Sequence, residues 1–329
     1  MVKKKIVVIG GGSGNFMVLS GLKKYPVELT AVVCMSDDGG STGILRDEMG
    51  VLPPGDVRQC LVALSHSSQT LRDLFNYRYS EPGLSGHSFG NLFLSTLEKI
   101  TGSFESAVTE ASRILRIKGW VFPVTLENTR LVAVFKDGTK IVGQKNISYC
   151  DHDFSDLKEL SLEPKAKLNP KILKTLKSLK KTDKIVISPG NFHSTLIPNF
   201  LVDGLAKAIK GSKAKVICVV NLMARVKQTD KFTLNDYILN LEKYIGKNTI
   251  KHAIYNTETP SKELLEKYAQ GGEKIMPTEN FDKIKSVKFL GHKLLGKKVQ
   301  VINKNDALAS RRSLIRHDPD KLAKIIYNL

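Results

Sequence analysis

The chain has 329 residues, with 51 Lys and Arg against 32 Asp and Glu, and therefore a formal net charge of +19. Its 41% hydrophobic and 25% charged residues exclude a disordered or collagen-like chain and are typical of a globular protein. No apolar run approaches the ~20 residues of a membrane span. The four cysteines are widely spaced and form no Cys-x-x-Cys pair, which argues against a disulfide scaffold or a structural zinc site. We therefore expect a cytoplasmic protein without a membrane span.

The positive charge is concentrated in the second half of the chain. Residues 1–150 contain 17 basic and 13 acidic side chains, whereas residues 151–329 contain 34 and 19. The densest lysine stretch coincides with a predicted amphipathic helix at about 169–181, with Asn169 as its cap and Pro170 in its first turn. Nucleic-acid readers usually add Arg and stacking aromatics, which this stretch lacks. We therefore interpret it as a solvated helix face and disfavour nucleic acid as a partner.

The first elements predict an α/β fold. An apolar strand at 5–9 is followed by a glycine turn, a helix at 15–24 and a second buried strand at 27–35. Two further strands of this buried type, at 184–188 and 215–220, flank a helix at about 198–210. Continuous apolar strands suit a sheet that is covered on both faces. We expect a Rossmann-like, doubly wound, mostly parallel sheet in one domain that spans residues 1–329.

A small antiparallel β-hairpin insertion is predicted at about 121–147. Three strand-like runs cover 121–126, 130–136 and 140–146, and the turn at 136–139 contains Gly138, which accepts a positive φ. Further strands are expected at 252–256 and 299–302, and Asp318-Pro319 opens a terminal helix.

The first loop follows strand 5–9 and has the sequence Gly-Gly-Gly-Ser-Gly-Asn. It lacks the GxGxxG spacing of dinucleotide sites and the Gly-Lys-Ser/Thr of a Walker A loop. Glycines after a strand nevertheless let backbone N–H groups converge on an anion at a helix N-terminus. We expect a phosphate or another ligand to bind at Gly11, Gly12, Ser13, Gly14 and Asn15.

The second loop, at 36–46, carries two adjacent carboxylates. Asp37 and Asp38 are candidate catalytic residues and candidate ligands of Mg²⁺. The residues that would meet phosphate oxygens or surround them are Gly39, Gly40, Ser41, Thr42 and Arg46. An aspartate cap followed by a turn is the simpler alternative, but it explains only part of this sequence.

Further loops add polar candidates. Arg58, His87 and Asn91 are candidate ligand contacts, although a buried structural role is equally open for His87, whereas Asp56 and Ser88 are compatible with simple N-caps. Loops 188–195 and 221–223 follow the later strands. In a parallel sheet, the loops after strands 5–9, 27–35, 184–188 and 215–220 emerge at one carboxyl edge, where doubly wound folds bind ligands.

These motifs together resemble a known family. The segments GGGSGNFMVLSGL (10–22), SDDGGSTGILRDEMGVLPPGDVRQCLVAL (36–64), GHSFGNL (86–92), FPVTLE (122–127), SPGNFHSTLIPNFLV (188–202), NLM (221–223) and RHDPDKLA (316–323) are similar to the gluconeogenesis factor (YvcK-type) family. That family is related to the 2-phospho-L-lactate transferase (CofD) superfamily. The resemblance runs from residue 10 to residue 323 in matching order.

The resemblance implies a cytoplasmic Rossmann-like protein that binds UDP-sugars, notably UDP-N-acetylglucosamine. Such proteins are needed for growth and cell shape on gluconeogenic carbon sources. Their transferase relatives use Mg²⁺ to move a phospholactyl-type group from a nucleoside diphosphate donor. By position, the resemblance implies ligand contacts in the four loops at Gly12, Ser13, Gly14, Asp37, Asp38, Ser41, Thr42, Gly190, Asn191, Ser194 and Asn221. It adds Tyr268 and Arg316 in the C-terminal part.

The chain also departs from the family pattern near the expected ligand. Ser188 replaces a usual glycine, Asn191-Phe192-His193 replaces Ser-Leu-Tyr, and 224–228 (ARVKQ) replaces a Thr-Gln-Pro-Gly-Glu-like stretch. We expect a UDP-sugar-binding regulator without turnover. The alternatives are a Mg²⁺-dependent transferase and, less favoured, a nucleic-acid binder. A second copy of the chain is a further partner to consider.

Overall fold

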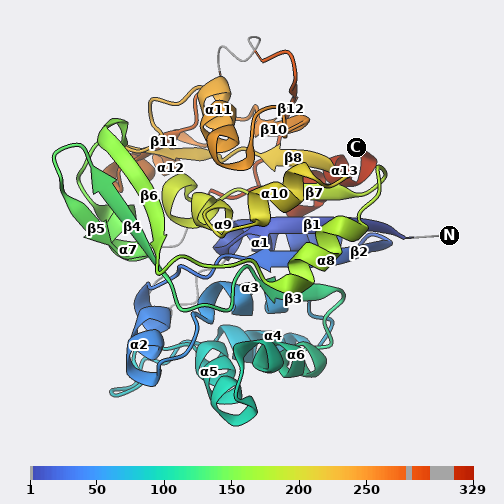
Figure 1. The fold of residues 1–329 in the computed structure, drawn as a ribbon, viewed down its shortest axis with the longest axis vertical. Helices are drawn as coiled ribbons and strands as arrows, with labels where there is room; N and C mark the ends of the chain where they lie inside the picture. Colours follow the sequence, from blue (N-terminus) through green and yellow to red (C-terminus); the bar gives the residue numbers. More distant parts are fainter. Residues whose placement is uncertain (1–2, 279–283, 297–314) are drawn as a thin grey trace.

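A seven-stranded parallel sheet forms the centre of the molecule, as shown by a computed structural model that describes residues 3–278, 284–296 and 315–329 (Figure 1). The strand order is β12-β10-β8-β7-β1-β2-β3. The strands are β1 (Lys4–Gly10), β2 (Val27–Val33), β3 (Trp120–Pro123), β7 (Lys184–Ile187), β8 (Lys215–Val219), β10 (His252–Asn256) and β12 (Lys288–His292). This order confirms the Rossmann-like α/β class.

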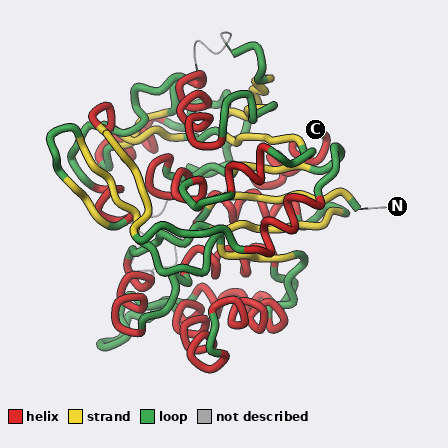
Figure 2. The backbone as a smooth tube through the Cα atoms, viewed as in Figure 1, coloured by secondary structure: helices red, strands yellow, loops and turns green. Residues whose placement is uncertain are grey.

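Helices cover both faces of this sheet. Figure 2 shows them as red segments in front of and behind the yellow strands. In front lie α8 (Pro170–Ser178), α9 (Ile197–Phe200), α10 (Leu205–Lys210) and α11 (Leu234–Ile245), and behind lie α1 (Gly12–Leu22), α3 (Gly55–Leu64) and α13 (Pro319–Asn328). The double cover explains why the residues from Ile6 to Ile9 are at most 1% exposed.

The remaining helices lie around the sheet. Below β3 in Figure 1 are α4 (Gln69–Asn76), α5 (Phe89–Thr101) and α6 (Phe104–Ile114), beside α2 (Gly40–Met49), and α12 (Lys262–Gln270) packs against the strand β11 (Glu273–Ile275). Asn169 caps α8 by accepting a hydrogen bond from the Lys171 N–H, and Pro170 stands in the first turn, as predicted. Among the helices of the described ranges, none has the length and apolarity needed to cross a membrane.

Two small antiparallel sheets extend the fold. The first contains β4 (Arg130–Phe135), β5 (Lys140–Val142) and β6 (Leu157–Glu163), and Figure 1 shows it, with α7 (Gln144–Tyr149), at the carboxyl edge of the main sheet. The second pairs β9 (Met223–Arg225) with β11 (Glu273–Ile275). The hairpin insertion predicted from the sequence is therefore present.

Several details of the prediction were wrong or incomplete, and the edge strand β12 of the main sheet was not predicted. The first strand assigned to the insertion is β3, which pairs in parallel with β2 in the main sheet. The third ends at Val142, because a helix begins at Gln144, and β6 was not predicted. The helix expected at 198–210 is divided into α9 and α10 at Gly204, whose φ is +97°. The strand expected at 299–302 lies outside the described residues.

Candidate functional site

The two loops at the centre of the sheet meet where the strand order reverses. β1 lies between β2 and β7, so the chain leaves β1 toward one side and β7 toward the other. The glycine loop after β1 touches the loop after β7 so closely that a Cβ atom on Gly14 would lie 1.7 Å from the Pro189 carbonyl oxygen. Only glycine at position 14 permits this contact, and it brings the N-terminus of α1 to the ligand edge of the sheet.

A cavity of about 300 Å³ opens beside these loops. It brings together seven residues that the sequence nominated, from segments far apart in the chain: Ser13, Gly14, Gly190, Asn191, Asn221, Tyr268 and Arg316. Tyr268 belongs to α12, and its hydroxyl accepts a hydrogen bond of 2.8 Å from the Ile315 N–H, next to Arg316. Three of the four loops that were expected at this edge, those after β1, β7 and β8, therefore line the cavity together with the C-terminal segment, whereas no residue of the loop after β2 lines it.

Asn221 holds the floor of this cavity together. Its Oδ1 accepts a hydrogen bond of 2.9 Å from the Gly190 N–H, and its Nδ2 donates one of 2.7 Å to the Gly190 carbonyl. The buried Tyr237 hydroxyl donates to the same Oδ1 at 3.3 Å. Asn221 thus positions the loop after β7 and leaves little of its amide for a ligand.

Asn191 and Ser194 also support the loop after β7. The Asn191 Oδ1 accepts a hydrogen bond of 3.4 Å from the Ser194 N–H. Ser194 is fully buried, and its hydroxyl accepts a hydrogen bond of 2.8 Å from Ser148 in α7. Ser194 therefore ties the antiparallel insertion to the loop after β7.

One wall of the cavity contains three residues that we did not predict. Arg225 in β9 lies opposite Glu273 in the register of the antiparallel strand β11. The Arg225 guanidinium lies 4.6 Å from the centroid of the Tyr149 ring. Burial raises the pKa of Glu273, although the charge of Arg225 acts in the opposite direction. Arg225 lies in the 224–228 stretch that departs from the family pattern, which was the only sequence signal for this wall.

A pair of carboxyl groups lies on the other side of the glycine loop. Asp56, in the first turn of α3, contacts this loop: a Cβ atom on Gly11 would lie 2.2 Å from the Asp56 Oδ2. Burial, together with the negative charge of Asp37, raises the pKa of Asp56 to about 8. Burial also raises the pKa of Asp37, against the hydrogen bond of 3.0 Å that its Oδ1 accepts from the Gly39 N–H. Two destabilised carboxylates suit a cation or a shared proton.

Asp38 has a different role from the one we expected. Its carboxylate accepts hydrogen bonds from the Gln144 N–H at 3.0 Å and the Lys145 N–H at 2.8 Å, at the start of α7. Asp37 and Asp38 stay predicted ligands of Mg²⁺, and Asp56 is a further carboxyl that interacts with Asp37. Among the described residues, no group of three or more His, Cys, Asp or Glu side chains is placed to hold a metal ion. A metal at Asp37 and Asp56 would need further oxygen ligands from a bound molecule.

Arg46, a predicted phosphate contact, and Arg58, a predicted ligand contact, are both buried and hydrogen-bonded within the protein. Arg46 is 3% exposed and donates to the Asn128 side chain and the Thr129 carbonyl. Arg58 is 5% exposed and donates to the Asn91 Oδ1 at 2.9 Å and to the Asn76 Oδ1 at 2.7 Å. Both guanidinium groups hold the second loop and its neighbours in place.

A buried network fixes the remaining nominated side chains of this region. The Asn91 Nδ2 donates to the Ser41 hydroxyl at 3.2 Å and to the Thr42 hydroxyl at 3.5 Å, and the Ser41 hydroxyl lies 3.1 Å from the His87 Nδ1. Ser88 caps α5, as expected. Gly39 and Gly40 lead into α2, where Gly40 has a φ of +50°. The hydrogen bonds from Asn91 and His87 therefore hold Ser41 and Thr42 of the acidic loop in place.

Asn15 is directed into the protein rather than toward a ligand. Its side chain is fully buried, and its Nδ2 donates to the Val32 carbonyl at 3.4 Å. Of the first loop, Ser13 and Gly14 line the cavity, whereas Gly11 and Gly12 face the Asp56 carboxylate. The glycine loop therefore separates the cavity from the carboxyl pair.

Comparison with known proteins identifies the family. The family model described as 2-phospho-L-lactate transferase CofD matches residues 6–299. This chain belongs to the CofD family. A protein of Aquifex aeolicus named "Putative gluconeogenesis factor" is 38% identical over 100% of this chain and 97% of that protein. A "Gluconeogenesis factor" of Listeria innocua is 36% identical over 98% of this chain and 94% of its own length.

A solved structure agrees with this assignment. A member of the UPF0052 family from Bacillus halodurans superposes with a TM-score of 0.88 at 33% identity, and the match covers 99% of each chain. The predicted resemblance is therefore confirmed at the level of the CofD family and of relatives named as gluconeogenesis factors. The matched range of the CofD family model includes the glycine loop, the acidic loop and the PPGD segment that carries Asp56.

Proposed function

We propose that this chain binds a nucleotide-sugar of the UDP-N-acetylglucosamine type in the cavity beside β1 and β7. In this proposal, binding of the ligand regulates carbon metabolism, cell shape and envelope synthesis during gluconeogenic growth, in the cytoplasm and without turnover. The names of the relatives support the link to gluconeogenesis. The ligand class rests on the residues that line the cavity, which combine a helix N-terminus, two arginines and two tyrosines.

The cavity offers separate features for the parts of such a ligand. Ser13 and Gly14 lie at the N-terminus of α1, where backbone N–H groups and the helix dipole favour a phosphate. Arg225 and Arg316 supply positive charge at the opposite wall, and the rings of Tyr149 and Tyr268 supply flat surfaces. A diphosphate that joins a base to a sugar matches this combination of anion site, cations and rings.

Isothermal titration calorimetry tests this proposal. UDP-N-acetylglucosamine should give saturable heat with one site per chain, and UDP should bind more tightly than uridine because uridine lacks the diphosphate. A matched control is the variant Lys262→Glu, since Lys262 is 92% exposed and is not part of the cavity. Absence of heat at millimolar ligand would remove the proposal.

The carboxyl pair supports a second candidate function. In this alternative, the chain transfers a phospholactyl-type group from a nucleoside diphosphate donor, and the description of the matching family as a 2-phospho-L-lactate transferase supports the group that is transferred. An acceptor hydroxyl oxygen would form a bond to the distal phosphorus while the bond from that phosphorus to the bridging oxygen breaks. The hydroxyl proton would pass to a carboxylate or to solvent, and a nucleoside monophosphate would leave.

Asp37 and Asp56 fit Mg²⁺ in this alternative because both carboxyl groups are destabilised by burial. A bound Mg²⁺ would offset negative charge on the phosphates. Release of nucleoside monophosphate that requires Mg²⁺, and that is lost in Asp56→Asn but kept in Asp47→Asn, would select the transferase. Ligand binding without any such release would select the regulator.

A further inference from the structure

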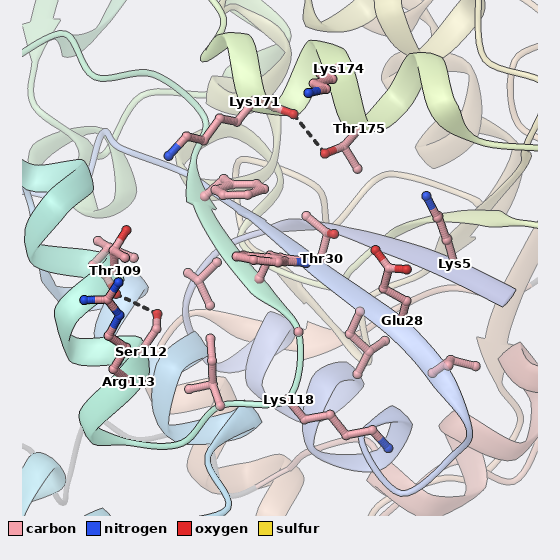
Figure 3. A pocket seen from close by; sticks show the side chains of 18 of the residues that line it. Lys5, Glu28, Thr30, Thr109, Ser112, Arg113, Lys118, Lys171, Lys174 and Thr175 are labelled. Atoms are coloured by element: carbon pink, nitrogen blue, oxygen red, sulfur yellow. Dashed lines mark hydrogen bonds between the residues drawn. The ribbon is translucent and has the colours of Figure 1, made fainter. Parts of the chain in front are cut away.

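A second hollow lies far from the carboxyl edge, at the amino-terminal ends of β1, β2 and β3. It has a volume of about 1050 Å³ and lies between α6 and α8. Figure 3 shows Lys171, Lys174 and Thr175 at the top, Thr109, Ser112 and Arg113 at the left, and Thr30, Glu28 and Lys5 from the centre toward the right. We call this hollow the β3 groove. None of its lining residues lines the cavity beside β1 and β7.

The β3 groove exposes the one tryptophan of the sequence. Trp120 is 56% exposed, although it begins the edge strand of the main sheet. Its ring is stacked 6.2 Å from that of Phe122, and the ammonium of Lys171 lies 6.0 Å from the Phe122 centroid. Tryptophan left at a surface is enriched at sites where proteins bind one another, because covering its ring removes a large apolar area from water.

Positive charge surrounds this aromatic floor. The lining contains seven basic residues, namely Lys3, Lys5, Arg113, Arg116, Lys118, Lys171 and Lys174, against the two acids Glu28 and Glu105. Glu105 is already paired with Lys171 at 3.1 Å. Lys174 projects from α8 and has no carboxylate partner among the described residues. The lysine helix that the sequence analysis interpreted as a solvated face therefore forms one wall of a basic groove.

We propose that the β3 groove binds an acidic segment of a partner protein that places an aromatic or aliphatic side chain on Trp120. An apolar centre with a polar rim is the usual arrangement of a protein interface, and here the charge of the rim selects an acidic partner. A single-stranded nucleic acid fits less well, because two carboxylates lie in the lining and five of the seven cations are lysines rather than arginines.

The single tryptophan makes this proposal directly measurable on the full chain. The probe is a synthetic peptide of Asp and Glu residues with one central Phe and no Trp, so that all tryptophan emission comes from Trp120. Binding should shift the emission of Trp120 to shorter wavelength as the ring leaves water. A matched peptide with Asn and Gln in place of the acids should bind at least about tenfold more weakly, because the charge of the rim is then not used.

Two variants locate the binding. Lys174→Glu should weaken the acidic peptide about fivefold, whereas Lys262→Glu, far from the groove, should change it less than twofold. Trp120→Ala should abolish binding of a fluorescein-labelled acidic peptide, measured by anisotropy while circular dichroism confirms the fold. The proposal is overturned by no emission shift up to about 1 mM peptide, by equal affinity for the neutral peptide, or by tighter binding of an oligouridylate at the same salt concentration.

Discussion

The carboxyl group of Asp56 interacts with that of Asp37, although 18 residues separate the two in the sequence. Burial and the negative charge of Asp37 together raise the pKa of Asp56 to about 8. A carboxyl that keeps its proton near neutral pH is a feature of functional sites more often than of structural ones. The interaction between Asp37 and Asp56 therefore favours a functional role for the acidic loop over that of an ordinary turn.

The first prediction concerns pH. The unfolded chain releases the Asp56 proton near the ordinary value of 3.8, whereas the folded chain keeps it until about pH 8. The folded state then binds more protons between these values, so this group makes the free energy of unfolding fall as the pH rises from about 4 to about 8. Asp56→Asn should remove the effect, so that urea unfolding shows the variant to be more stable than the wild type at pH 8 and equal to it near pH 4.

The same variant tests for a cation. Mg²⁺ at pH 8 should raise the melting temperature of the wild type, because the metal offsets the two buried negative charges, and it should leave Asp56→Asn unchanged. Asp47, whose side chain is 60% exposed, provides the control Asp47→Asn, which should respond as the wild type does. An equal response of all three proteins would place any metal elsewhere.

The second prediction concerns Arg225. Replacing it with glutamine, Arg225→Gln, should weaken UDP-N-acetylglucosamine about tenfold, since a charged hydrogen bond to the ligand is lost. The affinity for uridine should change little, because uridine carries no phosphate. Glu273→Gln should leave the affinity for the sugar nucleotide the same or higher, because Arg225 keeps its charge. Equal losses for uridine and for UDP-N-acetylglucosamine in Arg225→Gln would contradict a contact between Arg225 and the phosphates.

The third prediction concerns Asn221. Asn221→Ala should lower the free energy of unfolding by about 1–3 kcal/mol, because the backbone groups of Gly190 and the Tyr237 hydroxyl lose their partner. Urea unfolding measures this loss. Asn240→Ala, which removes one hydrogen bond to the Asp236 carbonyl and one exposed hydrogen bond from Lys243 within α11, should cost clearly less. A similar cost for the two variants would show that Asn221 does not organise the floor of the cavity.

The fourth prediction concerns Asp38. Asp38→Ala leaves the Gln144 and Lys145 N–H groups without their acceptor and should cost about 1 kcal/mol of stability, as the loss of a helix cap does. Backbone hydrogen exchange in α7 should accelerate. The ring of Tyr149, which ends this helix, should be held less firmly. Unchanged exchange in α7 would refute the role of Asp38 as its anchor.

The sequence was sufficient for five strands of the main sheet, β1, β2, β7, β8 and β10, but it did not predict β12. Strands such as β1 and β2 are continuous apolar runs, and a glycine loop after a strand has few structural explanations. It was not sufficient for β6, where the exposed Lys158, Glu159 and Glu163 are interspersed with buried leucines and obscure the pattern. It also assigned β3 to the insertion, because a short strand does not indicate which neighbour it will pair with.

Side-chain roles were harder to predict than loops. Arg46 and Arg58 were expected in ligand loops, yet they belong to α2 and α3, and both are buried and hydrogen-bonded within the protein. Asp56 is compatible with a helix cap in the sequence, and only the folded chain brings it to Asp37. Tyr268 and Arg316 were nominated by resemblance alone, and the structure places both at the cavity. The contact between Arg225 and the Tyr149 ring could not be predicted, because the two residues are far apart in the sequence.

A crystal structure of the chain with UDP-N-acetylglucosamine tests the central claim most directly. The account predicts the diphosphate beside the Ser13 and Gly14 backbone at the N-terminus of α1, with Arg225 or Arg316 within hydrogen-bond distance of the ligand. A nucleotide bound away from this cavity, or a cavity that stays empty at saturating ligand, would contradict it.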